Sequence, residues 1–287
     1  MAREDREFDK THLSIDQAES RGFIHRDYIA HCLRWSHVCK WLMQGHRYKS
    51  SVLLDIGCGK ELPLAKLLYS SRMTGGTYIG VDLNKLELPG ALKKAVLNNK
   101  LKVELYGKTD ASSKTFPSLL SGARVNVAVS FEAFEHMNPK AAVQLLRHVY
   151  QILQPGGIFF ISTPCWNGQA AANHINETTY QALGWLLEQV GFDVEDVFGT
   201  FASIRDYEAR LQEWGLAAAF GRLREYYDTN YLATVFAPLF PGQARNCLWR
   251  CLKPNGPKDR EPRGFDKPEL KQELWSQHQD WRALTRG

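Results

Sequence analysis

Short apolar runs alternate along the chain with segments whose apolar residues recur every three or four positions. The runs predict buried strands, and the three-to-four spacing predicts amphipathic helices. Predicted strands lie at 51–56, 77–82, 101–106, 125–130, 158–162, 192–198 and 246–252. Predicted helices lie at 26–44, 62–70, 86–98, 138–153 and 177–189, and residues 199–243 are largely helical. Alternating strands and helices predict an α/β fold around an open, mostly parallel sheet.

The same pattern divides the chain into parts. We expect an N-terminal helical cap at 1–48, a core at 49–198, a helical insertion at 199–243, a final core strand at 244–253 and a tail at 254–287. The insertion interrupts the path between the last two strands, so it is a candidate lid over the substrate. The tail is rich in Pro, Gly and charge, which predicts a surface segment or partial disorder.

Composition and charge exclude several classes. The chain has 287 residues, 44% hydrophobic and 23% charged, as in ordinary soluble proteins. The net charge of +5 comes without a Lys/Arg-rich block, so it permits a nucleic-acid partner without arguing for one. The first ten residues lack the apolar core of a signal peptide, and no apolar run is long enough to span a bilayer. We therefore expect a cytoplasmic protein without membrane contact, whose six cysteines stay reduced.

A glycine turn between residues 52 and 68 carries the first chemical signal. The run Val52-Leu-Leu-Asp-Ile-Gly-Cys-Gly enters the turn, and the turn opens a helix. Gly57 and Gly59 let the backbone approach a ligand closely. The second strand ends in Asp82, at about the spacing of an acid that accepts the hydroxyl protons of a ribose. The unit predicts an adenosine-containing cofactor.

The identity of that cofactor depends on the rest of the pattern. A dinucleotide fingerprint needs a third glycine where this chain has Leu62, which argues against NAD. By contrast, Asp55-x-Gly-x-Gly, Asp82 and Asp110 resemble the motifs of class I S-adenosylmethionine-dependent methyltransferases, of the type 11/23 kind. The segments 129–137 and 153–157 resemble two further motifs of that family, in the same order and spacing.

The resemblance implies a seven-stranded, doubly wound, Rossmann-like sheet with a helical insertion. It implies S-adenosyl-L-methionine as cofactor, with binding residues at Asp55, Gly57, Cys58, Gly59, Asp82, Leu83, Asp110, Ala111, Ser130 and Phe131. Asp110 would reach the adenine amino group, although a loop aspartate is also an ordinary turn residue. One departure is Glu61, which stands where the family usually has a third glycine and must turn away from the cofactor.

Glu132, Glu135 and His136 form a second candidate site, because their i, i+3, i+4 spacing would place them on one helical turn. His174 follows the fifth strand and could join them. Such a set can bind a divalent ion. The same Glu-x-x-Glu-His pattern occurs in O-methyltransferases that place Mg²⁺ beside a substrate hydroxyl, which implies Mg²⁺ as a possible cofactor. The alternative is a metal-free site in which His136 or His174 is a general base.

We therefore expect a methyltransferase acting on an oxygen or nitrogen of a small-molecule acceptor, with Glu135, His136 and His174 as catalytic residues. RNA or DNA is the alternative acceptor. The Asp/Asn-Pro-Pro-Tyr signature of amino-methylation on bases is absent, and Cys165 is expected to be structural rather than a nucleophile. A different class remains open, a regulatory subunit that binds S-adenosylmethionine without catalysis. The oligomeric state is also open.

Overall fold

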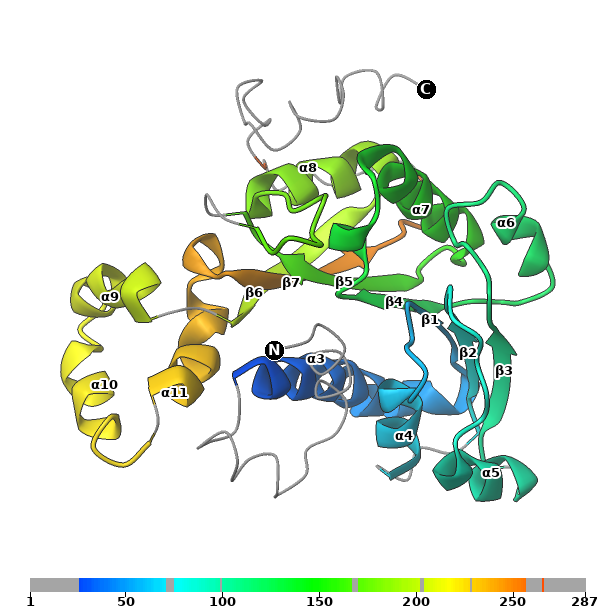
Figure 1. Ribbon diagram of the computed structural model, residues 1–287, viewed down its shortest axis with the longest axis horizontal. Helices are drawn as coiled ribbons and strands as arrows, with labels where there is room; N and C mark the ends of the chain where they lie inside the picture. The colour runs from blue at the N-terminus through cyan, green and yellow to red at the C-terminus, as the bar shows by residue number, and fades with distance from the viewer. Residues whose placement is uncertain are drawn as a thin grey trace.

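The sheet contains the strands β1 Val52–Ile56, β2 Thr77–Val81, β3 Lys102–Tyr106, β4 Val127–Phe131, β5 Ile158–Pro164, β6 Asp193–Phe201 and β7 Asn246–Leu252. They lie in the order β3-β2-β1-β4-β5-β7-β6 in a computed structural model (Figure 1). The structure describes residues 26–70, 75–98, 100–166, 170–201, 204–227, 229–256 and 265. The first five strands pair in parallel, and β7 pairs antiparallel with β5 and β6. The predicted seven-stranded α/β sheet is confirmed.

The strand order reverses between β1 and β4, and this reversal positions the site. β1 lies between β2 and β4, with Ile56 opposite Val81 on one side and Ser130 on the other. The loops after these three strands therefore leave the same edge of the sheet side by side. In open α/β sheets the crevice at such a switch point is where ligands bind.

Helices cover both faces of the sheet (Figure 1). One face carries α3 Arg26–Met43, α4 Pro63–Ser70 and α5 Gly90–Leu97, and the other carries α6 Phe116–Leu119, α7 Pro139–Ile152 and α8 Tyr180–Val190. Asn138 caps α7 by accepting a hydrogen bond from the Ala141 N–H. Thr179 caps α8 in the same way, so that helix begins three residues later than its pattern predicts.

Two apolar cores follow from this layering. The first packs α7, α8 and the insertion against one side of the sheet, around Phe159, Phe192 and Trp249. The second packs α3 and α4 against the other side, around Leu62 and Phe160. Strands buried on both faces read as continuous apolar runs, which is why periodicity located them.

The insertion forms the helices α9 Ile204–Glu213, α10 Ala217–Leu223 and α11 Thr229–Phe236, beyond β6 at the end of the sheet (Figure 1). Short 3₁₀ segments that the pattern did not separate lie at Gln44–Ser50, Phe134–His136, Ala237–Leu239 and Pro241–Gln243. α11 packs against α3 and β6. From the tail, Phe265 contacts the Tyr180 ring of α8, whereas residues 1–25 of the expected cap and most of the tail lie outside the described residues.

Two simpler expectations also have an outcome. Within the part of the chain that the structure describes, no helix combines the length and apolarity that a membrane crossing requires. All six cysteines are free thiols, and Cys32 alone among them is not buried.

Candidate active site

The glycine turn after β1 has the conformation that only glycine adopts easily. Gly57 and Gly59 have φ values of +74° and +67°. The Gly57 N–H donates to the Val81 carbonyl over 2.9 Å, which ties the turn to the end of β2. A Cβ on Gly57 would lie 2.9 Å from Cβ of Ala133, just after β4. A Cβ on Gly59 would meet no described atom within 4 Å, so the backbone there faces open space.

Asp82 faces this turn. Its Oδ2 accepts a hydrogen bond from the Gly59 N–H over 2.9 Å. Its Oδ1 accepts from both the backbone N–H and the side-chain amide of Asn84, each over 2.8 Å. A carboxylate offers about four acceptor positions, so roughly one remains for a ligand hydroxyl. Leu83 beside it is 72% exposed.

Asp55 lies beneath the turn and is only 6% exposed. The Tyr78 hydroxyl donates to its Oδ2 over 2.5 Å. Burial raises the pKa of Asp55 from 3.8 to about 7, because desolvation penalises the carboxylate and the Tyr78 hydrogen bond offsets only part of that penalty. Burial also raises the pKa of the neighbouring Cys58 thiol, so Cys58 stays protonated.

Glu61 and Leu62 continue the turn into α4. The Glu61 carboxylate lies 2.6 Å from Nζ of Lys66 on that helix, so the side chain engages α4, as the missing third glycine requires. Leu62 has a φ of +48° and is fully buried in the second core. Packing in the second core keeps Leu62 in this strained backbone conformation, at the position where the dinucleotide-binding motif has its third glycine.

The loop after β3 is anchored from α7. His148 is buried, and its Nδ1 lies 2.9 Å from the carbonyl oxygen of Ala111. Because a carbonyl only accepts, this nitrogen carries the proton and donates. Asp110 is exposed, and its Oδ1 accepts from the backbone and hydroxyl of Ser112 over 2.8 Å and 2.7 Å. Asp110 therefore makes a turn of its own, the ordinary role of a loop aspartate.

The end of β4 contributes Ser130 and Phe131. Ser130 is fully buried, and its hydroxyl has no hydrogen-bond partner among the described residues. Phe131 is half-buried and packs against the second core. Both flank the switch point, where the sequence predicts contact with the cofactor.

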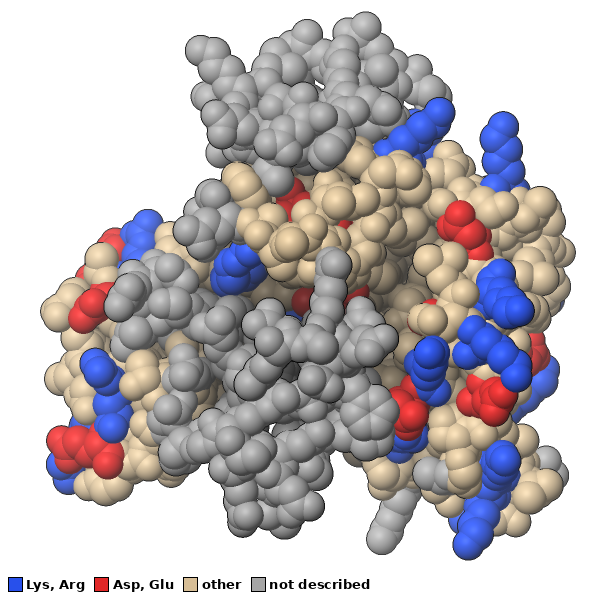
Figure 2. All heavy atoms as spheres, viewed as in Figure 1, with Lys and Arg blue, Asp and Glu red and all other residues tan. Residues whose placement is uncertain are grey.

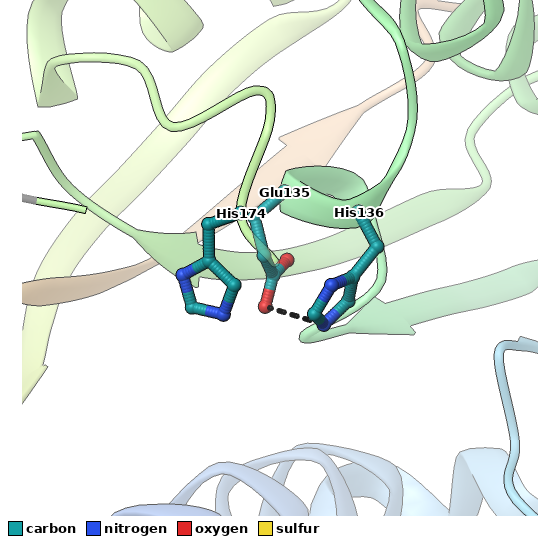
Figure 3. A group of neighbouring side chains, drawn as sticks. All are labelled: Glu135, His136 and His174. Atoms are coloured by element: carbon teal, nitrogen blue, oxygen red, sulfur yellow. Dashed lines mark ion pairs between the residues drawn. The ribbon is translucent and has the colours of Figure 1, made fainter. Parts of the chain in front are cut away.

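Three of the four predicted acid and imidazole residues come together beyond β4 (Figure 3). One ligand atom from each of Glu135, His136 and His174 lies within 4.8 Å of the other two. Glu135 is buried and accepts from the Thr163 hydroxyl over 3.2 Å. The Nε2 of His136 lies 3.8 Å from Oε1 of Glu135. The rings of His136 and His174 meet edge to face, with their centroids 4.9 Å apart. We refer to these three residues as the acid–imidazole cluster.

Hydrogen bonds fix the orientation of the histidine rings. The Nδ1 of His136 lies 3.2 Å from the carbonyl oxygen of Asn173, a pure acceptor. The Asn173 amide nitrogen lies farther from the same atom, at 3.5 Å. The Nδ1 of His174 lies 2.5 Å from Oε1 of Glu177. In both rings Nδ1 is therefore the donor, which leaves an Nε2 lone pair for the cluster.

Glu132 lies outside the cluster, and the expected single helical turn is not formed. The first helical segment after β4 is the 3₁₀ turn Phe134–His136, and Glu132 precedes it with a φ of +55°. Its carboxylate accepts from the Ser162 hydroxyl over 2.9 Å and from the Asn246 amide over 2.8 Å. It also lies 3.7 Å from the Arg34 guanidinium. The left-handed backbone turns this side chain toward α3 and β7.

Three charged residues beside the predicted acid and imidazole residues belong to no predicted site. Arg34 is 2% exposed. It lies four residues after Ala30 and four residues before Val38, on the buried face of α3, and this spacing is the sequence signal that could have identified it. Glu177 and Arg245 carry no local signal, since they meet only through the fold. Arg245 donates to both oxygens of Glu177, over 2.7 Å and 3.2 Å.

Cys165 is 4% exposed and lies within the first core. Its backbone N–H donates to the Arg245 carbonyl over 2.7 Å. A substrate base could not reach its thiol without displacing core residues, which supports the structural role expected for it.

Comparison with known proteins gives a consistent result. Residues 42–197 match a family model described as a methyltransferase domain. Over 175 residues the chain is 35% identical to a probable S-adenosylmethionine-dependent methyltransferase of Mycolicibacterium smegmatis, covering 58% of this chain and 62% of that protein. Over 116 residues it is 28% identical to the mitochondrial ubiquinone biosynthesis O-methyltransferase of Dictyostelium discoideum, covering 39% and 34%. The chain thus matches less than two thirds of the length of these relatives.

Among solved structures, the fold resembles magnesium protoporphyrin IX methyltransferase from Synechocystis PCC 6803 with bound S-adenosylhomocysteine. The TM-score is 0.52 and the sequences are 12% identical, with 86% of this chain and 94% of that one covered. At this identity the likeness concerns the fold alone.

Proposed function

The chain belongs to the methyltransferase-domain family, the class I S-adenosylmethionine-dependent methyltransferases, and we propose from this premise that it methylates a small molecule. The acceptor atom would be an oxygen or nitrogen that carries a proton, with a hydroxyl oxygen as first choice. One observation carries the proposal. The acid–imidazole cluster lies close to the glycine turn, since a Cβ on Gly57 would lie 2.9 Å from Cβ of Ala133, two residues before Glu135.

The residues at the switch point fit S-adenosylmethionine. Gly59 faces open space, Asp82 keeps an acceptor position for a ribose hydroxyl, and Leu83 offers an exposed apolar surface to a base. Asp55 and Ser130 lie below the turn, where the methionine end would bind. When bound, the cofactor supplies a methyl group that its sulfonium has already activated. The protein then has to position the acceptor and remove a proton.

The cluster is suited to accept that proton. His136 and His174 both direct Nε2 lone pairs toward the space beside Glu135 (Figure 3). A neutral imidazole near pH 7 is the commonest general base in enzymes, and such a base contributes about 10²–10⁴-fold to rate. The nearby guanidiniums of Arg34 and Arg245 are paired with Glu132 and Glu177. These features favour a neutral hydroxyl or amine over an anionic acceptor.

A divalent ion is the second possibility at the same residues. Ligands of one ion lie at most about 4–5 Å apart, which matches the spacing of the cluster. Two imidazoles and one carboxylate are a donor set that suits Zn²⁺ or Fe²⁺ better than Mg²⁺, which prefers oxygen ligands. A bound ion would lower the pKa of a substrate hydroxyl. Because the Glu132 side chain turns away, we propose Glu135, His136 and His174 as the ligand set. The binding of Mg²⁺ at this site stays a prediction.

Several features support a small acceptor over a nucleic acid. On the face in Figure 2, the described Lys and Arg side chains interleave with Asp and Glu, and among the described residues there they form no continuous basic surface. We propose that the 199–243 insertion covers the acceptor as a lid. Its exposed aromatic residues, among them Trp214 and Tyr231, could contact an apolar substrate.

The first test is cofactor binding followed by turnover. Calorimetry should detect S-adenosylmethionine and S-adenosylhomocysteine, and NAD should not bind. A panel of hydroxylated and amino small molecules, with RNA and DNA oligonucleotides beside them, is then incubated with S-adenosylmethionine while S-adenosylhomocysteine is measured. Cofactor binding without product on any acceptor would favour the regulatory subunit. Turnover on oligonucleotides alone would overturn the small-molecule proposal.

The second test separates a base from a metal. Replacing His174 by Asn should lower turnover about 10²–10⁴-fold while cofactor affinity holds. If the cluster holds an ion, chelation should also reduce turnover, and adding back Zn²⁺, Fe²⁺, Mn²⁺ and Mg²⁺ in separate samples should identify the metal. Unchanged turnover after replacement of His174 by Asn, and likewise of His136 by Asn, would show that the cluster takes no part in catalysis.

A further inference from the structure

A chain of polar groups, with Glu177 buried at its centre, lies behind the acid–imidazole cluster. Glu177, in the loop before α8, is 1% exposed and lies 2.5 Å from Nδ1 of His174 through its Oε1. On its other side the Arg245 guanidinium donates to Oε2 over 2.7 Å and to Oε1 over 3.2 Å. Neither residue belongs to the cluster itself. Glu177 lies three residues after His174 in the same loop, and Arg245 reaches Glu177 because that loop packs beside the start of β7.

The pairing settles the charge state of the carboxylate. Both oxygens of Glu177 accept hydrogen bonds from the two guanidinium nitrogens of Arg245, and Oε1 also faces Nδ1 of His174. A forked guanidinium that binds both oxygens is the strongest neutral-pH partner for a carboxylate. An ionised carboxylate only accepts hydrogen bonds, so the proton of a neutral His174 must sit on Nδ1. Its lone pair then belongs to Nε2, which Figure 3 shows on the side of Glu135.

We propose that Glu177, held by Arg245, is a positioning residue that keeps His174 in the Nδ1–H tautomer with Nε2 directed into the cluster. The inference rests on the proposed function of His174 as proton acceptor or ligand. Carboxylates behind imidazoles perform this task in many sites, and their loss costs about 10- to 100-fold in affinity or activity. The alternative is a purely structural role for this pair, since Arg245 also donates a hydrogen bond to the Cys165 carbonyl and so links the loop to β7.

The first readout is the tautomer itself. In protein labelled with ¹⁵N-histidine, long-range ¹H–¹⁵N correlation spectra distinguish Nδ1–H from Nε2–H, and comparison with His174→Asn assigns the signal. Wild-type protein at mildly alkaline pH should show Nδ1–H at His174. In Glu177→Gln the amide can present either its oxygen or its NH₂ group, so the Nε2–H form should appear. Glu177→Asp keeps the carboxylate and should retain Nδ1–H.

The second readout is a double-mutant cycle. Glu177→Gln should lower kcat about 10- to 100-fold with the KM for S-adenosylmethionine unchanged, and Glu177→Asp should recover part of this loss. In the His174→Asn background, Glu177→Gln should have no further effect, because it acts through His174. The control is Glu195→Gln, which breaks an ion pair with Arg250 between β6 and β7 and should leave kcat as in wild type.

The outcomes separate the two proposals. A wild-type Nε2–H tautomer overturns the inference, and this readout stands even if Glu177→Gln fails to fold. A loss in folded Glu177→Gln that persists fully in the His174→Asn background also overturns it. A Glu195→Gln loss of equal size would point to general damage and also overturn it. A wild-type Nδ1–H tautomer that shifts in Glu177→Gln supports the inference even when no acceptor is methylated. In that case the proposed function fails by itself.

Discussion

Asp82 is the residue at which the predicted cofactor affinity can be worked out from the structure. Its carboxylate already accepts three N–H groups, one from Gly59 and two from Asn84. About one acceptor position is left, so a ribose contributes one charge-assisted hydrogen bond rather than the two that the sequence suggested. Such a bond contributes about 1.5–3 kcal/mol, which corresponds to roughly 10- to 150-fold in affinity.

Asp82→Ala should therefore weaken S-adenosylhomocysteine binding at least about 10-fold in calorimetry. The variant also frees the Gly59 N–H, so thermal unfolding should occur at a lower temperature, and circular dichroism should confirm that the tested protein is folded. The matched control is Asn84→Ala, which removes one donor to the same carboxylate but keeps its charge and the Gly59 bond. We expect less than about threefold loss for the control.

Two results would refute this reasoning. A folded Asp82→Ala variant that binds as tightly as wild type would show that the ribose does not reach this carboxylate. An equal loss in Asp82→Ala and Asn84→Ala would show that the hydrogen bonds around the carboxylate, and not its ligand contact, set the affinity.

Three further variants test other parts of the structure. Gly59→Ala should lose cofactor affinity in calorimetry, because its methyl group enters the open space of the turn. The control is Gly75→Ala, which has a φ of +96° at the opposite edge of the sheet and should lose only about 1–2 kcal/mol of folding stability. Equal cofactor affinities in the two variants would contradict this prediction. Asp55, with its folded pKa raised by burial from 3.8 to about 7, stabilises the protein below about pH 4, and this stability is lost as pH rises toward 7. Denaturant titrations should show that fall, up to about 4 kcal/mol, flattened in Asp55→Asn. Arg34→Met should lower the free energy of unfolding, measured by denaturant titration, by about 3–5 kcal/mol, because the Glu132 carboxylate keeps its charge but loses the Arg34 guanidinium. The double variant with Glu132→Gln should recover part of this stability.

Local patterns determined much of this protein. Strands buried on both faces and helices with one apolar face leave different periods in the sequence, so all seven strands could be placed before the fold was known. The glycine turn and Asp82 could also be identified, because the conformational freedom of glycine and the end of a strand are properties of adjacent residues. Even the meeting of Glu135 with His174 followed from strand order, since the ends of neighbouring parallel strands share one edge.

Only the tertiary structure decided which of the predicted groups face one another. Spacing placed Glu132 with Glu135, but a left-handed backbone at Glu132 sends its side chain to Arg34 instead, and no local pattern reports a positive φ at a non-glycine residue. Glu177 and Arg245 are 68 residues apart and acquire a common role only where β5 and β7 pair antiparallel. Glu177 is three residues from His174, but the Arg245 guanidinium that holds its carboxylate comes from a distant segment, so the proposed tautomer of His174 depends on the fold as well as on its own segment.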